Sequence, residues 1–269
     1  MRINSSQNTN ILNSFRNNVQ NTMQQSAERL SSGRRINSAA DDAAGLAISS
    51  RMDSLIRSLD QGSRNAADMD SAMRTADGSL STITDSLQRI RELAVASANP
   101  ILSDANRNAL QNEVNQHLDQ IQRAAGDTQF NTIRLLDGSF ADMHMASNPN
   151  GSGMQISIQN TSLDTLGIAN FDVSGGRPDI AAIDNAISMV SANRSDIGAA
   201  QNRIEHIIDS NSTASLNQAA ARSRITDADM ALEAMLWEQQ QVLQQYQIFS
   251  VRNQMERDRQ SLGFVGVSW

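Results

Sequence analysis

An unbroken heptad pattern between residues 48 and 94 constrains the fold more strongly than any other feature of the sequence. Apolar or small residues recur there at spacings that alternate between four and three, which is the pattern of a helix in a coiled coil. The positions are Ile48, Met52, Leu55, Leu59, Gly62, Ala66, Met69, Met73, Ala76, Leu80, Ile83, Leu87, Ile90 and Ala94. Ser38 and Asp41 are spaced to cap this helix, and Pro100 ends it. A helix over residues 40–98 would be roughly 85–90 Å long, so the sequence predicts an elongated, mainly α-helical rod.

Two further segments carry the same kind of pattern. The first, residues 103–125, begins at a capping serine and places four apolar residues on one face: Leu110, Val114, Leu118 and Ile121. In the second, residues 180–208, heptad-spaced Ile and Val are interrupted at Arg194 and Gln201. Polar residues at such positions fix register or partner choice in coiled coils. These heptad positions are predicted to pack helix against helix within one subunit.

Both ends of the chain predict amphipathic helices that need an external surface. Gly33 closes the N-terminal helix, and Thr226 with Asp229 predicts the cap of the C-terminal one. Asn and Gln flank both apolar stripes, so each helix alone would be marginally stable, and five of the nine aromatic residues follow position 236. Burial between subunits is therefore expected for Leu12, Phe15, Val19, Met23, Leu30, Leu232, Met235, Val242, Tyr246 and Phe249.

Only residues 128–176 read as non-helical, and they predict a small β excursion between the helical arms. Residues 154–159 alternate apolar and polar side chains, which is typical of a half-buried strand. Residues 132–136 are the predicted partner strand, and residues 148–151, Asn-Pro-Asn-Gly, have the composition of a turn.

Composition excludes several classes of function. The sequence contains no cysteine and no lysine, which excludes disulfides, thiolate metal sites, Schiff-base lysines and Walker-type phosphate loops. The formal net charge of −7 argues against nucleic acid or an anionic membrane surface as partner, and no apolar stretch is long enough to span a membrane. The three histidines, His117, His144 and His206, lie far apart in the sequence. We therefore expect that the protein is not an enzyme and has no cofactor and no metal site. Residues 1–8 lack the apolar core of a secretory signal peptide.

Five stretches of the chain resemble bacterial flagellin. They are residues 30–47 (LSSGRRINSAADDAAGLA), 87–95 (LQRIRELAV), 128–131 (TQFN), 194–203 (RSDIGAAQNR) and 221–231 (ARSRITDADMA). Little more than the β excursion separates the two arms, so the chain resembles a core-only flagellin that lacks the variable outer domains of the family. It ends in GFVGVSW, up to Trp269, where the family tends to have a Leu-rich tail. This departure weakens any inference about partners that recognise the usual tail.

The resemblance implies a fold and a division of the chain. The implied fold is a long α-helical coiled-coil or bundle rod with a small β-hairpin excursion, whose terminal helices order on assembly. Residues 1–36 and 225–269 would be the inner-tube helices (D0-like). Residues 37–127 and 177–224 would be the helical arms (D1-like), and residues 128–176 the β excursion of D1.

The function implied by the resemblance is structural. The chain would polymerise as a helical homopolymer into the flagellar filament for motility, after type III export to the outside of the cell. Implied partners are further copies of the chain, a flagellin-specific export chaperone at the C-terminal helix, and the filament cap and hook-junction proteins. Two alternatives remain: a hook–filament junction protein of the same family, and a chemoreceptor-like signalling coiled coil, which would need membrane spans.

A receptor surface is also implied. In the family, toll-like receptor 5 reads the region of residues 88–95, with matching positions at Arg89, Leu93 and Glu113 here. Leu87, Ile90 and Ala94 occupy heptad positions, so part of this segment is expected in the core. Gln88, Arg89, Glu92 and Leu93 lie off these positions, and we expect them on the outside of the long helix, where either a neighbouring subunit or a receptor can contact them. Receptor binding is therefore expected at Gln88, Arg89, Leu93 and Glu113.

Overall fold

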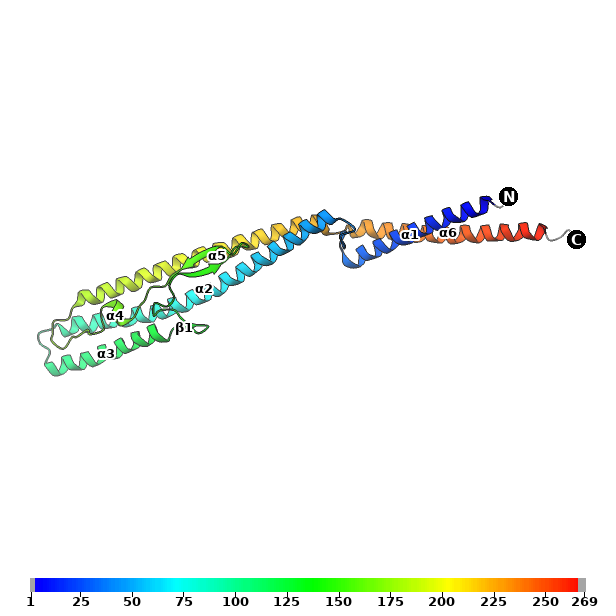
Figure 1. Ribbon diagram of the computed structural model, residues 1–269. Coiled ribbons are helices and arrows are strands. Elements are labelled where there is room, and N and C mark those ends of the chain that lie inside the picture. Colours follow the sequence, from blue (N-terminus) through cyan, green and yellow to red (C-terminus); the bar gives the residue numbers. More distant parts are fainter. Residues whose placement is uncertain (1–2, 266–269) are drawn as a thin grey trace. The chain divides into compact units, whose positions relative to one another are not determined.

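The computed structural model describes residues 3–265 and is mainly α-helical (Figure 1). Over this range the chain forms six helices and two small antiparallel sheets. The elements are α1 (Ile3–Ser32), α2 (Ala43–Ser97), α3 (Asp104–Asp127), β1 (Gln129–Phe130), β2 (Ile133–Arg134), β3 (Met143–Ala146), β4 (Gly153–Ile156), α4 (Leu163–Leu166), α5 (Ile180–Thr226) and α6 (Met230–Val265).

The chain divides into two compact units. We call the unit formed by the residues up to Ser54 and those from Asn217 the terminal unit, and the unit Leu55–Leu216 the central unit. The long helices α2 and α5 contribute residues to both units.

The core of the central unit confirms the heptad prediction. From Leu59 to Ala94, every predicted heptad position of α2 is buried except Met69, which is half-buried. The buried faces of α3 and α5 complete this core, at Val114, Leu118 and Ile121 on α3 and at Ile183, Val190, Ile197 and Ile204 on α5. In the terminal unit the pattern weakens, since Ile48 is 49% exposed.

Ion pairs show that α2 and α5 run antiparallel in the central unit. Asp77 of α2 accepts a 2.8 Å bond from Arg194, and Arg91 of α2 donates a 2.7 Å bond to Asp184. As the residue number rises along α2, that of its partner on α5 falls. Arg194, one of the two polar interruptions of the heptad pattern, thus has a specific partner on the facing helix, and this bond raises its pKa.

Two helix ends differ from the prediction. Helix α2 begins later than expected, and its cap is Asp42, whose Oδ1 accepts a 2.8 Å bond from the Gly45 N–H. Asp41 instead accepts bonds from the N–H groups of Asn37 and Ser38, so the two residues predicted to cap the helix close a separate turn before it. Thr226 is the last residue of α5, and Asp229 alone caps α6 by accepting from the N–H groups of residues 231 and 232.

The predicted strand pairing is wrong. Strand β4 pairs with β3, in the register Met145↔Met154, and not with residues 132–136. Strand β2, which lies within that predicted segment, pairs with β1 across a tight turn at Asn131 and Thr132, both with positive φ. Each strand therefore pairs with its neighbour in the chain, because a short turn sets the register of a hairpin. The turn at residues 148–151 is confirmed, with Gly151 at φ +80°.

Side-chain amides attach the β excursion to the long helices. Asn65 of α2 donates a 2.9 Å bond to the Ala146 carbonyl, and Asn211 of α5 donates a 2.9 Å bond to that of Ser147. Further along, Asn193 donates to the Gln159 carbonyl at 3.1 Å. These amides satisfy backbone groups that have no partner strand on this side, which anchors residues 129–173 without a larger sheet.

In the terminal unit, α1 and α6 lie side by side (Figure 1). Arg29 of α1 and Glu233 of α6 form a 3.1 Å ion pair. Backbone bonds join the ends of these helices: the Arg35 N–H donates to the Thr226 carbonyl at 2.6 Å, and the Ala228 N–H to the Gly33 carbonyl at 3.0 Å. Gly33 closes α1 at φ +69°, as predicted.

Candidate interaction surfaces

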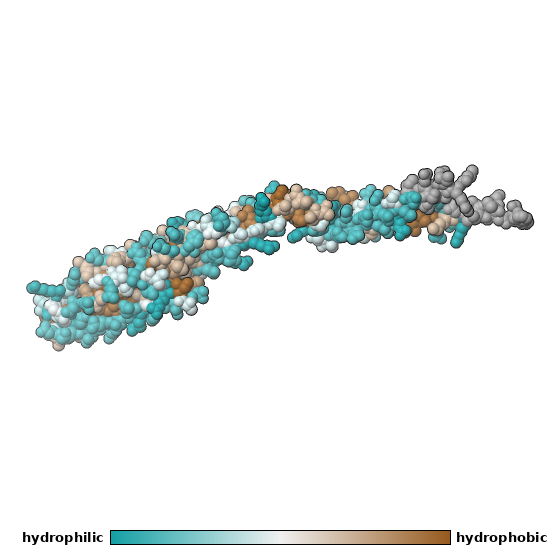
Figure 2. Space-filling model, viewed as in Figure 1, coloured by the Kyte–Doolittle hydropathy of each residue, from teal (hydrophilic) through white to brown (hydrophobic). Residues whose placement is uncertain are grey.

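Helix α6 exposes a large apolar surface. All five of its predicted assembly residues are between 50% and 69% exposed, namely Leu232, Met235, Val242, Tyr246 and Phe249. Four more apolar residues of α6 are also exposed: Met230, Ile248, Val251 and Met255. The prediction missed these four because they lie on other faces of the helix than the stripe it followed. Figure 2 shows hydrophobic atoms at the surface of this part of the chain among hydrophilic ones.

The predicted assembly residues of α1 differ more widely in their exposure to solvent. Phe15 is 47% exposed, whereas Leu12, Met23 and Leu30 are half-buried. Val19, which we expected to be buried between subunits, is only 4% exposed in the single chain and is therefore already covered within the subunit. Because α1 lies against α6, one side of its apolar stripe is already covered within the terminal unit.

A groove of about 600 Å³ lies between α1 and α6. Its apolar residues are Leu12, Ile248, Val251 and Met255. Its polar residues are Asn13, Arg16, Gln20, Gln244, Gln247 and Gln254. The groove is thus lined by four apolar side chains, five amides and one arginine.

The predicted receptor residues lie at one end of α2 and on the neighbouring α3. Gln88 and Arg89 are exposed. The guanidinium of Arg89 donates to Glu113 Oε1 at 2.7 and 2.9 Å and to Glu92 Oε2 at 2.9 Å. The hydrogen bond to Glu113 is the main reason that the pKa of Arg89 is raised. Arg89 and Glu113 are thus held together on one surface.

Leu93 does not belong to that surface. It is 4% exposed and is part of the core, so the expectation that it points outward is wrong. Helix α2 packs against both α3 and α5 (Figure 1), and its buried face is therefore wider than one row of heptad positions. A second row spaced by seven, Ala72, Ser79, Ser86 and Leu93, lies beside the first, and all but half-buried Ser79 are buried. This seven-residue spacing is the feature of the sequence that could have predicted the burial of Leu93.

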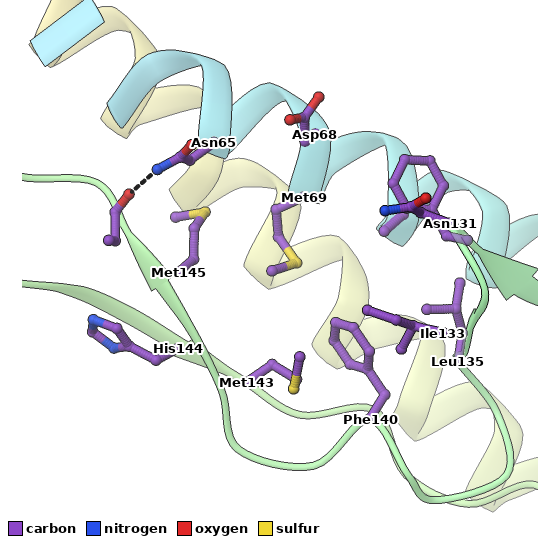
Figure 3. Close-up of a pocket in the computed structure, with 13 residues that line it drawn as sticks. Asn65, Asp68, Met69, Asn131, Ile133, Leu135, Phe140, Met143, His144 and Met145 are labelled. Carbon is purple, nitrogen blue, oxygen red and sulfur yellow. Dashed lines mark hydrogen bonds between the residues drawn. The ribbon is translucent and has the colours of Figure 1, made fainter. Parts of the chain in front are cut away.

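An unpredicted pocket of about 600 Å³ lies between α2 and the two hairpins (Figure 3). Met69 reaches into it from α2 toward Phe140 and Met143, and Asn65 borders it with its bond to the Ala146 carbonyl. His144 lies at its border, with Nε2 3.1 Å from the Gly151 carbonyl. The pocket is mostly apolar and holds no paired acid and base. Within the described residues, no cluster of His, Asp and Glu is arranged to hold a metal ion.

Two family models match the chain in the order of its helical arms. The bacterial flagellin N-terminal helical region matches residues 3–141, and the bacterial flagellin C-terminal helical region matches residues 180–263. The chain belongs to the bacterial flagellin family. Flagellins are structural proteins, and the short interval between the two matches fits a core-only flagellin. The last four residues of the tail GFVGVSW, in which the chain departs from the family, lie outside the described residues.

Relatives match more than four fifths of this flagellin. A flagellin of Halalkalibacterium halodurans is 43% identical over 84% of this chain and 85% of its own length. The flagellar filament 30.7 kDa core protein of Treponema maltophilum is 37% identical over 83% of this chain and 85% of its own. Among solved structures, the crystal structure of Bacillus cereus flagellin matches with a TM-score of 0.50 at 28% identity. That match covers 59% of this chain and 94% of that one. In the part of this flagellin that the structure describes, no helix combines the length and hydrophobicity needed to cross a membrane.

Proposed function

We propose that this flagellin, a structural subunit of the flagellar filament, holds its neighbours through the apolar surface of α6. The observation that carries the proposal is the concentration of exposed side chains there. Of the sixteen large hydrophobic residues that are exposed in the described part of the chain, nine lie on α6. Such a concentration on one helix is typical of an interface.

Energetics support burial of this surface on assembly. Complete burial of one large apolar side chain stabilises by about 1.5–3 kcal/mol, so several half-exposed ones per subunit provide a driving force of many kcal/mol. Identical subunits that use the same two non-equivalent surfaces form an open helical polymer when the rotation between neighbours does not close a ring. The groove between α1 and α6 offers the second surface, which accepts a terminal helix of a neighbour.

The finer division of the chain belongs to the same proposal. Residues 1–36 and 225–269 form the inner tube and become stably ordered on assembly. Residues 37–127 and 177–224 form the arms, and residues 128–176 the outer β excursion. The terminal unit contains both inner-tube segments, which supports this assignment. Before assembly, an export chaperone covers α6, and the subunit leaves the cell by the type III route to join the filament beside its cap and hook-junction proteins.

Recognition by toll-like receptor 5 is a second proposal. The exposed pair Gln88 and Arg89 and the neighbouring Glu113 supply the contacts. The two bonds from the guanidinium to Oε1 of Glu113 support this proposal because they fix the guanidinium in one orientation. Leu93 acts from the core by keeping this part of α2 in place. The receptor reads the free subunit, and this recognition is separate from filament assembly.

Polymerisation of α6 variants tests the main proposal. Replacing Tyr246 and Phe249 together with Gln removes two rings that are 69% and 62% exposed and lie outside the buried core. We expect an unchanged helix content by circular dichroism and a loss of sedimentable filaments under conditions where the unmodified chain polymerises. Ile101→Gln, at a residue that is 89% exposed outside the terminal helices, is the matched control and should polymerise normally. Normal filaments from the Tyr246/Phe249 variant would contradict the proposal.

A further inference from the structure

The tip of the β3–β4 hairpin carries the one Asn-Gly pair of the sequence, Asn150 and Gly151. Both residues are exposed, and so is the following Ser152. Gly151 has φ +80°, and no atom lies within 4 Å of the position that a Cβ would take. Because glycine has no side chain, nothing on residue 151 itself hinders the approach of its backbone nitrogen to the Asn150 amide.

Two donors converge on the side-chain oxygen of Asn150. Oδ1 accepts a 3.0 Å bond from the Ser152 N–H and a 2.6 Å bond from the Ser152 hydroxyl. The hydroxyl in turn accepts a 2.9 Å bond from Asn148 Nδ2, which directs its own proton toward Asn150. The Gly151 N–H donates a 3.0 Å bond to the Asn148 carbonyl.

We propose that Asn150 is a site of spontaneous deamidation, promoted by Ser152. The Gly151 nitrogen attacks Cγ of Asn150, a C–N bond forms, and the bond from Cγ to the side-chain nitrogen breaks. The proton lost by the Gly151 nitrogen leaves with the side-chain amine as ammonia, and a succinimide ring remains. Water then opens either of the two ring C–N bonds, which gives aspartate or isoaspartate at this position. No oxidant, reductant or further protein is needed.

The two hydrogen bonds to Oδ1 favour the first of these steps, which also requires the bond from the Gly151 N–H to the Asn148 carbonyl to break. Negative charge develops on Oδ1 as the nitrogen attacks, and two donors already aimed at that oxygen stabilise the charge as an oxyanion hole does. Nucleophile and electrophile belong to adjacent residues, so the ring closes within one segment of the chain and no second molecule has to be brought to it. The product adds one negative charge to the exposed tip of the hairpin. The isoaspartate form also lengthens the backbone where the N–H groups of Ser147 and Asn148 both bond to the Ser152 carbonyl.

Peptide mapping of the aged protein tests the proposal. The intact chain is incubated at mildly alkaline pH, and mass spectrometry follows the exchange of NH2 for OH at each asparagine. Asn37 is the internal reference because it is also exposed and precedes a small residue, but its side chain donates to the Arg34 carbonyl at 3.3 Å. We expect Asn150 to convert faster than Asn37. Equal or slower conversion of Asn150 would overturn the proposal.

Variants separate the role of Ser152 from the sequence effect of the Asn-Gly pair. In the folded protein, Ser152→Ala should slow conversion of Asn150 by about twofold to tenfold, the range expected for one hydrogen bond. Ser157→Ala, at an exposed serine of the same excursion, should leave the rate unchanged. In concentrated denaturant, Ser152→Ala and the unmodified chain should convert equally fast. An unchanged rate for folded Ser152→Ala, or the same slowing in denaturant, would overturn the assigned role of Ser152.

Discussion

Gly62 of α2 lies directly against the carbonyl oxygen of Ser147, where the chain leaves β3. A Cβ at Gly62 would come within 2.1 Å of this oxygen and 3.2 Å of Asn211 Nδ2, which donates to the same oxygen. Gly62 occupies a predicted heptad position, but its role is to let the β excursion approach the long helices. The β3–β4 hairpin is therefore anchored at a point where both α2 and α5 meet its backbone.

Gly62→Ala should destabilise the protein by about 1–3 kcal/mol, because backbone has to shift to admit the new methyl group. Gly78→Ala on the same helix is the control, since a Cβ there meets no atom within 4 Å. It should stabilise by about 0.5–1 kcal/mol through helix propensity. Chemical denaturation of both variants measures the difference. If Gly62→Ala is as stable as Gly78→Ala, the close contact with Ser147 does not exist.

Substitutions at Leu93 and at Arg89 should have separate effects, the first on stability and the second on receptor recognition. Leu93→Ala should cost about 2–5 kcal/mol of unfolding free energy because the side chain is in the core. Arg89→Ala should leave stability nearly unchanged, since the residue is exposed, and reduce toll-like receptor 5 signalling by soluble subunit at least about fivefold. Arg91→Ala is the control, because Arg91 is also exposed and paired, with Asp184. An equal response to the Arg89 and Arg91 variants would place recognition elsewhere.

The turn before α2 is held by the Asp41 carboxylate, and its stability should therefore depend on pH. Hydrogen bonds from Ser38 and Asn37 stabilise its carboxylate and lower its pKa below the ordinary 3.8. The stabilisation from a lowered carboxyl pKa is complete above the unfolded-state pKa and is lost as the pH falls through the folded-state pKa. The amide resonances of Asn37 and Ser38 should therefore shift with a midpoint below pH 3.8, and Asp41→Asn should abolish this transition. A midpoint at or above 3.8 would show that the turn does not hold the carboxylate.

The sequence predicted those parts of the fold that repeat along a helix. The heptad positions of α2 from Leu59 onward identified the core correctly because one helix face repeats many times. The second buried row was missed because Ser79 and Ser86 occupy it and do not read as apolar, and this error misplaced Leu93. The same periodicity selected five of the nine exposed apolar residues of α6, whereas the burial of Val19 depends on which side of α1 faces α6.

The β excursion shows why strand pairing and long-range contacts could not be predicted from local patterns. Strands β1 and β2 have two residues each, and β3 and β4 four, which is too short for alternation to select a partner. Long-range hydrogen bonds, such as the one from Asn65 to the Ala146 carbonyl, hold the excursion against the long helices. An asparagine on the surface of a predicted helix gives no indication of which distant backbone group it will contact.

Accessibility of α6 before and after assembly tests the central claim most directly. The chain contains no cysteine, so a single Val242→Cys substitution, close in size to the native residue, reports on one site of the apolar surface that is 64% exposed. Ser152→Cys, in the exposed hairpin turn, is the reference. We expect a maleimide reagent to label both cysteines rapidly in the monomer, and the cysteine at position 242 to become protected in filaments while that at position 152 stays reactive. Equal labelling of position 242 in monomer and filament would contradict the claim that α6 is buried between subunits.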